Sequence, residues 1–149
     1  TAIIVGLDGT LSDNRHRYHL IDPPQADWDG YHRLMAEDPV NVHCIEAINE
    51  AHAAGHKVYI LTSRPDTYLE PTRQWLNENK VHYDTLIMRD PEDERTEDRM
   101  KKDAYFQLIE PHAIPLFAID NKLVTISMWH NLDLDTYWVR QGSLIKLNC

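Results

Sequence analysis

Short apolar runs recur along the chain, separated by longer polar or amphipathic segments. Each run is rich in β-branched, aromatic or other apolar residues and ends in polar or turn-forming residues, which is typical of a buried strand. We therefore predict strands at Ala2–Leu7, Lys57–Leu61, Thr85–Met88, Leu116–Ile119 and Thr136–Val139.

The segments between these runs have the spacing of amphipathic helices. In the stretch from Glu97 to Ile109, for example, Met100, Ala104 and Leu108 fall on one helical face. Acidic residues occupy the first turn of that stretch, where they interact favourably with the helix dipole. By similar criteria, helices are predicted at Asn41–Ala54, Pro71–Asn79, Glu97–Ile109 and Lys122–Trp129.

The order of these elements predicts the fold class. Strands that alternate with helices indicate an α/β protein, here a parallel five-stranded sheet with helices on both faces and right-handed crossovers. One long irregular piece, from Ser12 to roughly Val40, interrupts the alternation. We interpret it as a small lid inserted after the first strand, with one helix around Trp28–Ala36. At 149 residues, the chain is predicted to form a single domain over residues 1–149.

Composition and charge narrow the range of functions. Hydrophobic residues make up 42% of the chain and charged residues 26%, which is ordinary for a globular protein. No apolar run reaches the roughly 20 residues of a membrane span and no signal peptide is visible, so we expect a cytoplasmic protein without a membrane partner. The net charge of −9 disfavours an extended nucleic-acid surface more than it disfavours an enzyme that acts on one terminal phosphate. Cys44 and Cys149 are expected to be free thiols.

Polar side chains follow the predicted strands at their carboxyl ends. In an open parallel sheet these ends meet at one rim, and ligands bind there. Each of these residues alone has an ordinary interpretation as a turn, a cap or a surface residue, but together they predict a site at the rim. They are Gly6, Asp8 and Thr10 after the first strand, Thr62, Ser63 and Arg64 after the second, Arg89 after the third, and Asp120 and Asn121 after the fourth.

Four stretches of sequence, in order, resemble a known family. They read "LDGTLSDNRHRYHLID", "AGHKVYILTSRPD", "RTEDRMKKDAYFQLIEPH" and "FAIDNKLVTISMWHNLDLDTYWV". Together they are similar to the haloacid dehalogenase (HAD) superfamily. More narrowly, they resemble the 3′-phosphatase domain of bacteriophage polynucleotide kinase and its single-domain phage and bacterial relatives. The resemblance covers nearly the whole chain. It implies a HAD-like Rossmann-type fold and magnesium-dependent hydrolysis of phosphate esters at nucleotide or polynucleotide 3′ ends.

The resemblance assigns catalytic roles position by position. The aspartate that would attack phosphorus is replaced here by Gly6, and the general acid and base corresponds to Asp8. The hydroxyl that holds a phosphate oxygen corresponds to Thr62. The lysine that neutralises nucleophile and phosphate corresponds to Lys101, with Lys102 as the alternative register. The expected substrate and phosphate contacts are Thr10, Ser63, Arg64, Arg17 and Arg89, although a solvated loop is an equal alternative for the segment around Arg17.

The resemblance also implies a magnesium site. In the family the ion is held by the nucleophilic aspartate, by a backbone carbonyl that corresponds to Asp8, and by an acid that corresponds to Asp120. Asn121 stands where the family often has a further aspartate. Because Gly6 and Asn121 each remove a negative charge, we expect magnesium binding to be weak or absent. The glycine is also expected to open room in the pocket.

A covalent mechanism cannot run without its nucleophile, so Gly6 predicts an impaired or inactive phosphatase. Three explanations remain open. The chain is a natural pseudo-phosphatase that binds a phosphorylated ligand or a protein, such as a phage interaction protein acting in the host cytoplasm. Alternatively it is a phosphatase whose nucleophile has been substituted, or an enzyme with an unusual mechanism.

Among the aromatic residues, Trp28 and Tyr31 in the lid are the candidates to contact a nucleobase, although packing is their commoner role.

Overall fold

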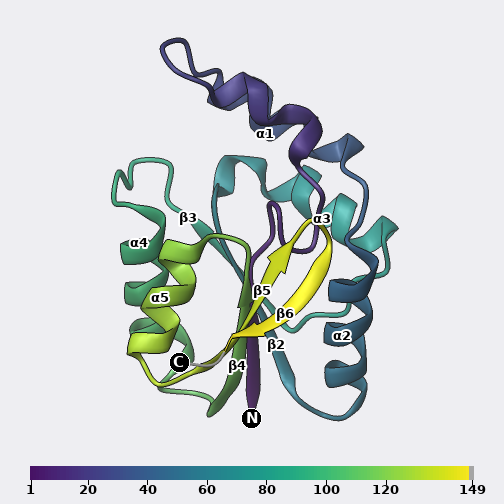
Figure 1. Ribbon diagram of the computed structural model, residues 1–149, viewed down its shortest axis with the longest axis vertical. Coiled ribbons are helices and arrows are strands. Elements are labelled where there is room, and N and C mark those ends of the chain that lie inside the picture. The colour runs from purple at the N-terminus through teal and green to yellow at the C-terminus, as the bar shows by residue number, and fades with distance from the viewer. Residues whose placement is uncertain (148–149) are drawn as a thin grey trace.

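The computed structural model describes residues 1–147 as a sheet between two layers of helices, with a lid at one end (Figure 1). The strands are β1 (Ala2–Val5), β2 (Lys57–Pro65), β3 (Thr85–Arg89), β4 (Pro115–Asp120), β5 (Asp135–Arg140) and β6 (Ser143–Leu147). The α-helices are α1 (Trp28–Arg33), α2 (Val42–Ala53), α3 (Leu69–Glu78), α4 (Glu97–Ala104) and α5 (Leu123–Asn131). Shorter 3-10 turns lie at Arg15–Ile21, Leu34–Glu37 and Asp66–Tyr68, and a π-helical turn lies at Tyr105–Ile109.

The sheet confirms the predicted fold class with one correction. Its strand order is β3-β2-β1-β4-β5-β6, and the five predicted strands run parallel to one another. The sixth strand, β6, was not predicted and runs antiparallel to β5. Gln141 and Gly142 both have positive φ, 49° and 81°, which is the backbone of a tight hairpin turn. This turn folds the C-terminal segment back onto the edge of the sheet.

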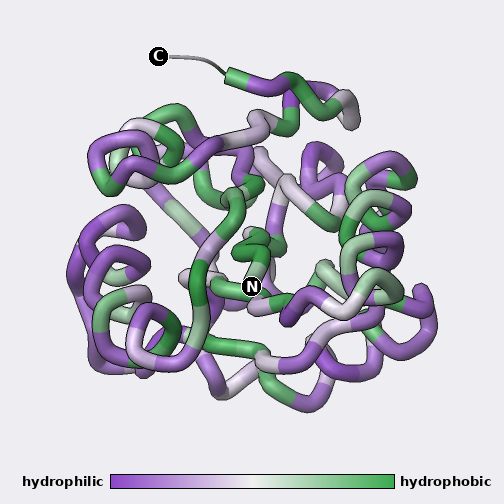
Figure 2. Tube along the Cα trace, turned by 90° about the horizontal axis from the view of Figure 1, so that it is seen from below, coloured by the Kyte–Doolittle hydropathy of each residue, from purple (hydrophilic) through white to green (hydrophobic). Residues whose placement is uncertain are grey.

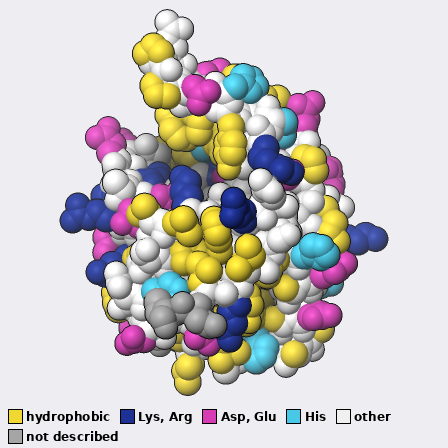
Figure 3. All heavy atoms as spheres, in the orientation of Figure 1, with side chains coloured by type: hydrophobic (Ala, Val, Ile, Leu, Met, Phe, Trp, Pro, Cys, Tyr) yellow, Lys and Arg dark blue, Asp and Glu magenta, His cyan; other side chains and the backbone are white. Residues whose placement is uncertain are grey.

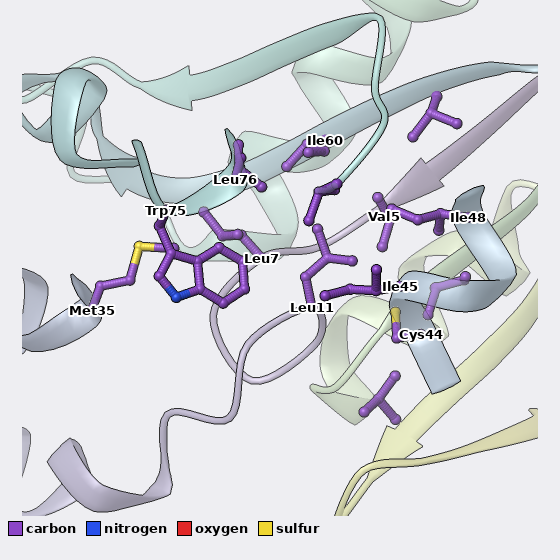
Figure 4. Packing of buried hydrophobic residues seen from close by; sticks show 14 residues of the cluster. Val5, Leu7, Leu11, Met35, Cys44, Ile45, Ile48, Ile60, Trp75 and Leu76 are labelled. Carbon is purple, nitrogen blue, oxygen red and sulfur yellow. The ribbon is translucent and has the colours of Figure 1, made fainter. Parts of the chain in front are cut away.

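Two hydrophobic clusters hold the helices against opposite faces of the sheet. Because side chains alternate along a strand, Val5 belongs to one cluster and its neighbour Ile4 to the other. Figure 4 shows the first cluster, in which Trp75 of α3 and Ile48 of α2 pack on the sheet. Helices α4 and α5 cover the other face, and the apolar residues gather between the layers in Figure 2. Within this interior Cys44 is a buried free thiol, while Cys149 lies outside the described residues.

The predicted helices are present, but the last turn after α4 corrects one expectation. Met100 and Ala104 are buried as predicted, whereas Leu108 is 49% exposed and Ile109 is fully buried. The reason is the π-helical turn Tyr105–Ile109, which inserts one residue into the helical repeat. The apolar face therefore moves on by one position.

The lid rises from the rim of the sheet above the carboxyl ends of the parallel strands (Figure 1). Its two stems meet where Ser12 and Val40 form an antiparallel bridge. The Asn41 side chain donates to the carbonyls of Thr10 and Ser12 at 2.8 and 3.2 Å, which fixes the base of the lid. Asp27 caps the start of helix α1, because its carboxylate accepts a hydrogen bond from the Gly30 N–H. Within residues 1–147, none of the helices has both the length and the apolar character needed to cross a membrane.

Candidate functional site

Gly6 lies just beyond the end of the central strand β1, in a tightly packed place. Its N–H donates to the carbonyl of Ile119 at 2.9 Å, and its backbone lies outside the left-handed region. A Cβ atom at this position would lie 3.0 Å from the Thr10 hydroxyl and 3.2 Å from both carboxylate oxygens of Asp120. The expectation that glycine opens room in the pocket is therefore wrong, because the neighbouring polar side chains already occupy that space.

Lys101 and Asp120 form a buried ion pair beside Gly6. The Lys101 Nζ lies 2.8 Å from Asp120 Oδ2 and 3.0 Å from Glu97 Oε1. Burial disfavours the charged lysine, but the two carboxylates outweigh burial and raise the pKa of Lys101 above its ordinary value. Burial likewise opposes the charge of Glu97, but Lys101 and Lys122 lower its pKa to about 2. Lys102 is exposed, so the structure places Lys101 rather than Lys102 at the rim.

Asp8 is held by a buried arginine from the lid. Arg17 is fully buried, and its guanidinium donates to Asp8 at 2.5 Å and to both carboxylate oxygens of Asp38 at 2.8 and 2.6 Å. It also donates to the Tyr31 carbonyl at 2.9 Å, and it lies over the Tyr31 ring at 4.2 Å. Burial opposes the charge, yet Asp38 and Asp8 raise the pKa of Arg17 above its ordinary value. Arg17 is therefore neither in a solvated loop nor part of the cavity lining, and its guanidinium instead provides the counter-charge of Asp8 and buried Asp38.

A second buried arginine connects the strand β2 to the lid. Arg64 donates to the Thr72 hydroxyl at 2.9 Å and to the backbone carbonyl of His32. Burial, together with the nearby charge of Arg17, lowers the pKa of Arg64 below its ordinary value, although the Asp8 carboxylate 3.8 Å away acts against them. The backbone N–H of Arg64 donates to the Thr62 hydroxyl at 3.1 Å. As an acceptor in that bond, the Thr62 hydroxyl keeps its own proton free to donate to a ligand.

A cavity of about 800 Å³ lies between the lid and the rim. Figure 3 shows the surface hollowed below the lid, with hydrophobic and basic side chains near one another around the hollow. The predicted site residues that line the cavity are Asp8, Thr62, Ser63, Arg89 and Asn121. The others lie behind this wall and are Gly6, Thr10, Arg17, Arg64, Lys101 and Asp120. The structure therefore brings the predicted residues together at one rim. Five of them line the cavity, and the other six are buried behind these five.

The donor set at the rim does not fit a resident magnesium ion. The Asn121 amide is best satisfied with its nitrogen turned toward the Asp8 carbonyl, Asp120 Oδ1 and the Thr10 hydroxyl, which lie 3.2 Å away and share its two hydrogens. The other oxygen of Asp120 receives the Lys101 ammonium. Protein donors thus occupy the oxygens that a cation would need. Within residues 1–147, no group of three His, Cys, Asp or Glu side chains converges as a metal site would.

Several residues of the site were not found from the sequence. Glu97 is the second partner of Lys101, and their spacing of four residues on one helix was the signal that would have found it. Asp38, the partner of Arg17, is 21 residues away along the chain and carries no local signal. Arg89 was expected at the cavity and lines it, but its guanidinium donates to the carbonyls of Ser63, Asp93 and Arg95, and so it also holds the loop after β3.

Comparison with known proteins shows to which family this chain belongs. A family model described as the polynucleotide kinase PNKP phosphatase domain matches residues 1–144. This chain belongs to that family. The match confirms the resemblance drawn from the four sequence stretches. A curated relative of this phosphatase-family chain is a Bacillus cereus protein named "Putative nucleotidase", which is 26% identical over 112 residues. That alignment covers 70% of this chain and 59% of the relative.

Solved structures place the phosphatase-family fold in larger chains. Two matching chains come from structures of the Pnkp1/Rnl/Hen1 complex, one of which is described as an RNA repair complex. They are 30% and 31% identical to this chain, both with a TM-score of 0.80, over 93% and 95% of its length. This chain spans only 42% and 46% of theirs. A class C acid phosphatase from Bacillus anthracis, solved with tungstate bound, is 19% identical over 80% of this chain and 51% of its own, and its TM-score of 0.63 shows a shared fold.

Proposed function

We propose that this chain binds the phosphorylated 3′ end of a nucleotide or nucleic-acid strand and hydrolyses the phosphate ester slowly or not at all. The observation that carries this proposal is Gly6. It stands at the end of the central strand, where the family resemblance calls for the attacking aspartate, while the hydroxyl, the lysine and the remaining acids are retained around it. The site thus keeps groups that recognise phosphate and lacks the group that would attack it.

The neighbouring carboxylates are poor replacements for the missing nucleophile. Asp120 is bound on one oxygen by Lys101 and on the other by the Asn121 backbone N–H at 2.8 Å. Asp8 is bound by Arg17. Loss of a catalytic nucleophile costs roughly 10⁶-fold in rate in serine proteases, or about 8 kcal/mol of transition-state stabilisation. Hydrolysis by a positioned water is therefore expected to be slow.

Recognition of phosphate is assigned to the cavity wall. Within residues 1–147 the Thr62 hydroxyl accepts a hydrogen bond but donates none, Ser63 follows it on the lining, and the lysine and arginine cations lie behind or next to them. Hydrogen bonds from such groups to a charged oxygen are the stronger kind. A ligand phosphate held here would lie close to Asp8, whose ion pair with Arg17 reduces the repulsion between two negative groups.

The test separates binding from turnover. Calorimetric titration of the native chain with a nucleoside 3′-monophosphate should show binding, while phosphate release stays near the uncatalysed rate. Thr62→Val removes the hydroxyl at nearly constant volume and should weaken binding about tenfold. Thr85→Val is the matched control, because Thr85 is exposed in β3 and is not part of the cavity wall. Rapid release by the native chain would show that Gly6 is no obstacle to catalysis. Absence of binding would favour the protein-interaction alternative.

A further inference from the structure

Aromatic rings from the lid form one wall of the cavity. Binding of a phosphate group alone would not require them. The rings that line the cavity are those of Tyr18, Trp28, Tyr31, His32 and Tyr68. All but the last come from the lid. A volume of about 800 Å³ is typical of a pocket for a whole small molecule, roughly 300–1,000 Å³, and far exceeds the size of one phosphate. Hydroxyl, amide and guanidinium groups of Thr62, Ser63, Asn121 and Arg89 lie at the strand ends, opposite these rings, while Asp29, Asp93 and Glu94 add carboxylates elsewhere in the lining. The strand-end side therefore fits an anionic group and the ring side fits a flat apolar group.

The geometry of the rings distinguishes a structural role from a binding role. Tyr31 is buried, its face is covered by the Arg17 guanidinium at 4.2 Å, and its hydroxyl accepts a hydrogen bond from Asn14 at 2.8 Å. Tyr68 is covered in a similar way by Arg64 at 5.0 Å. Trp28, at the start of α1, is 54% exposed. The sequence suggested Trp28 and Tyr31 as candidates to contact a nucleobase. Tyr31 is packed inside the lid, whereas Trp28 is accessible to a ligand.

The neighbours of Trp28 fix the orientation of its indole. Tyr31 meets it edge-on, with ring centroids 5.7 Å apart and planes at 85°. His32 lies one helical turn along, with centroids 6.0 Å apart and planes at 31°. Burial, together with the charge of Arg64, lowers the pKa of His32 to about 4, so the His32 ring is uncharged at neutral pH, whereas the neighbouring Asp29 adds a carboxylate to the lining. An exposed indole held in one orientation by packed rings is a surface on which a base can stack at low entropic cost.

We propose that the lid binds the nucleobase next to the phosphate by stacking it on Trp28. This inference rests on the proposed function and adds to it a substrate class. The ligand is a nucleotide or an unpaired strand end, because a base inside a duplex has both faces covered by its neighbours. Stacking also accounts for recognition by an acidic protein, since every base presents a flat face whatever the charge of the surrounding surface.

The experiment compares three probes on the native chain, namely a nucleoside 3′-monophosphate, ribose 3-phosphate and the nucleoside itself. Trp28→Ala should weaken nucleotide binding about 5- to 150-fold and leave ribose 3-phosphate binding unchanged. Trp28→Phe keeps a ring and should restore part of the difference. Phe106→Ala is the matched control, because Phe106 is 46% exposed and is not part of the cavity lining. Quenching of tryptophan fluorescence by the nucleotide provides a second measurement. The quenching should disappear in Trp28→Ala, which keeps the buried Trp75 and Trp129 and the partly buried Trp138.

The outcomes separate the base site from the phosphate site. Equal binding of the nucleotide and ribose 3-phosphate, both indifferent to Trp28→Ala, would overturn the base site and keep the proposed function. Binding of the nucleoside as tightly as the nucleotide, lost in Trp28→Ala, would support the base site and overturn phosphate recognition. Failure of all three probes to bind would overturn both.

Discussion

A side chain added at position 6 meets three oxygens, those of the Thr10 hydroxyl and the Asp120 carboxylate, at 3.0 to 3.2 Å. Gly6→Asp is therefore expected to destabilise the fold by about 1–2 kcal/mol, through crowding and through repulsion between carboxylates. Under the proposed function, the new carboxylate would supply the nucleophile and an oxygen ligand for magnesium at the end of a rigid strand. We expect the melting temperature of the variant to recover in magnesium and phosphate release from a 3′-phosphorylated oligonucleotide to begin.

The control for this variant is Gly6→Asn, which has the same size without the carboxylate and should show the crowding but no turnover. Adding Asn121→Asp to Gly6→Asp should raise the activity further, because Asn121 otherwise directs a donor at the oxygens of Asp8 and Asp120. A folded double variant without turnover on oligonucleotides or nucleoside 3′-monophosphates would mean that the site has diverged beyond its nucleophile.

The low pKa of Glu97, about 2 against an ordinary 4.5, links this residue to stability at acid pH. A carboxylate with a lowered pKa contributes stability that is complete above the ordinary value and is lost as pH falls towards the folded value. We therefore expect Glu97 to contribute up to about 3 kcal/mol to the free energy of unfolding at pH 7, lost between about pH 4.5 and 2. Urea denaturation of Glu97→Gln should show a flatter profile in that window, whereas the exposed control Glu92→Gln should follow the native chain.

Among the elements, the lid depends on an arginine rather than on an apolar core of its own. Arg17 joins Asp38 and the Tyr31 carbonyl, both in the lid, to Asp8 on the rim. Arg17→Ala leaves the buried Asp38 carboxylate with the His16 imidazole, 2.6 Å away, as its remaining side-chain partner within residues 1–147 and should cost about 3 kcal/mol. Limited proteolysis should then cut the lid faster than in the native chain. Arg15→Ala is the control, because Arg15 is exposed and pairs only with its neighbour Asp13 among the described residues. Equal cleavage of the two variants would contradict this role.

The π-helical turn after α4 determines which of two neighbouring side chains, Leu108 or Ile109, contributes more to stability. A regular helix would give the opposite order. Ile109 is fully buried and Leu108 is half exposed. Ile109→Ala should therefore lower the free energy of unfolding by about 2–5 kcal/mol, because it leaves a cavity in the core. Leu108→Ala should change it by less than about 1 kcal/mol. Chemical denaturation of the two variants side by side measures the difference, and the reverse order would place the α4 face in the regular register.

For the whole molecule, the net charge of −9 limits how nucleic acid can bind. If one phosphate is contacted, the logarithm of the binding constant should fall with the logarithm of salt concentration with a slope near −1 or smaller in magnitude. Extending a 3′-phosphorylated oligonucleotide beyond its last nucleotides should add little affinity. Titrations at several salt concentrations test this, and a slope several times steeper would reveal an extended basic surface.

The sequence predicted the parallel strands, their helices and the position of the rim, because these depend on local periodicity and on the turn residues between elements. It did not predict β6, since a hairpin strand at the edge of a sheet carries a weak pattern. It misplaced Leu108, because a π-helical turn breaks the period from which the buried face was read. It did not predict that Arg17 and Arg64, expected as phosphate contacts, are buried, because their burial depends on Asp38, Thr72 and His32, which are distant in sequence.

The bridge between Ser12 and Val40 brings the two ends of the lid together beside Asn41. The segment between those ends is thus a cassette that leaves and re-enters the body of the protein at one place and contributes none of the six strands of the sheet. Under the proposed base site, a cassette with other rings would accept a different ligand while the residues of the rim remain the same. The exchange has one requirement, because the replacement must still bring an arginine and its carboxylate to Asp8, as Arg17 and Asp38 do here.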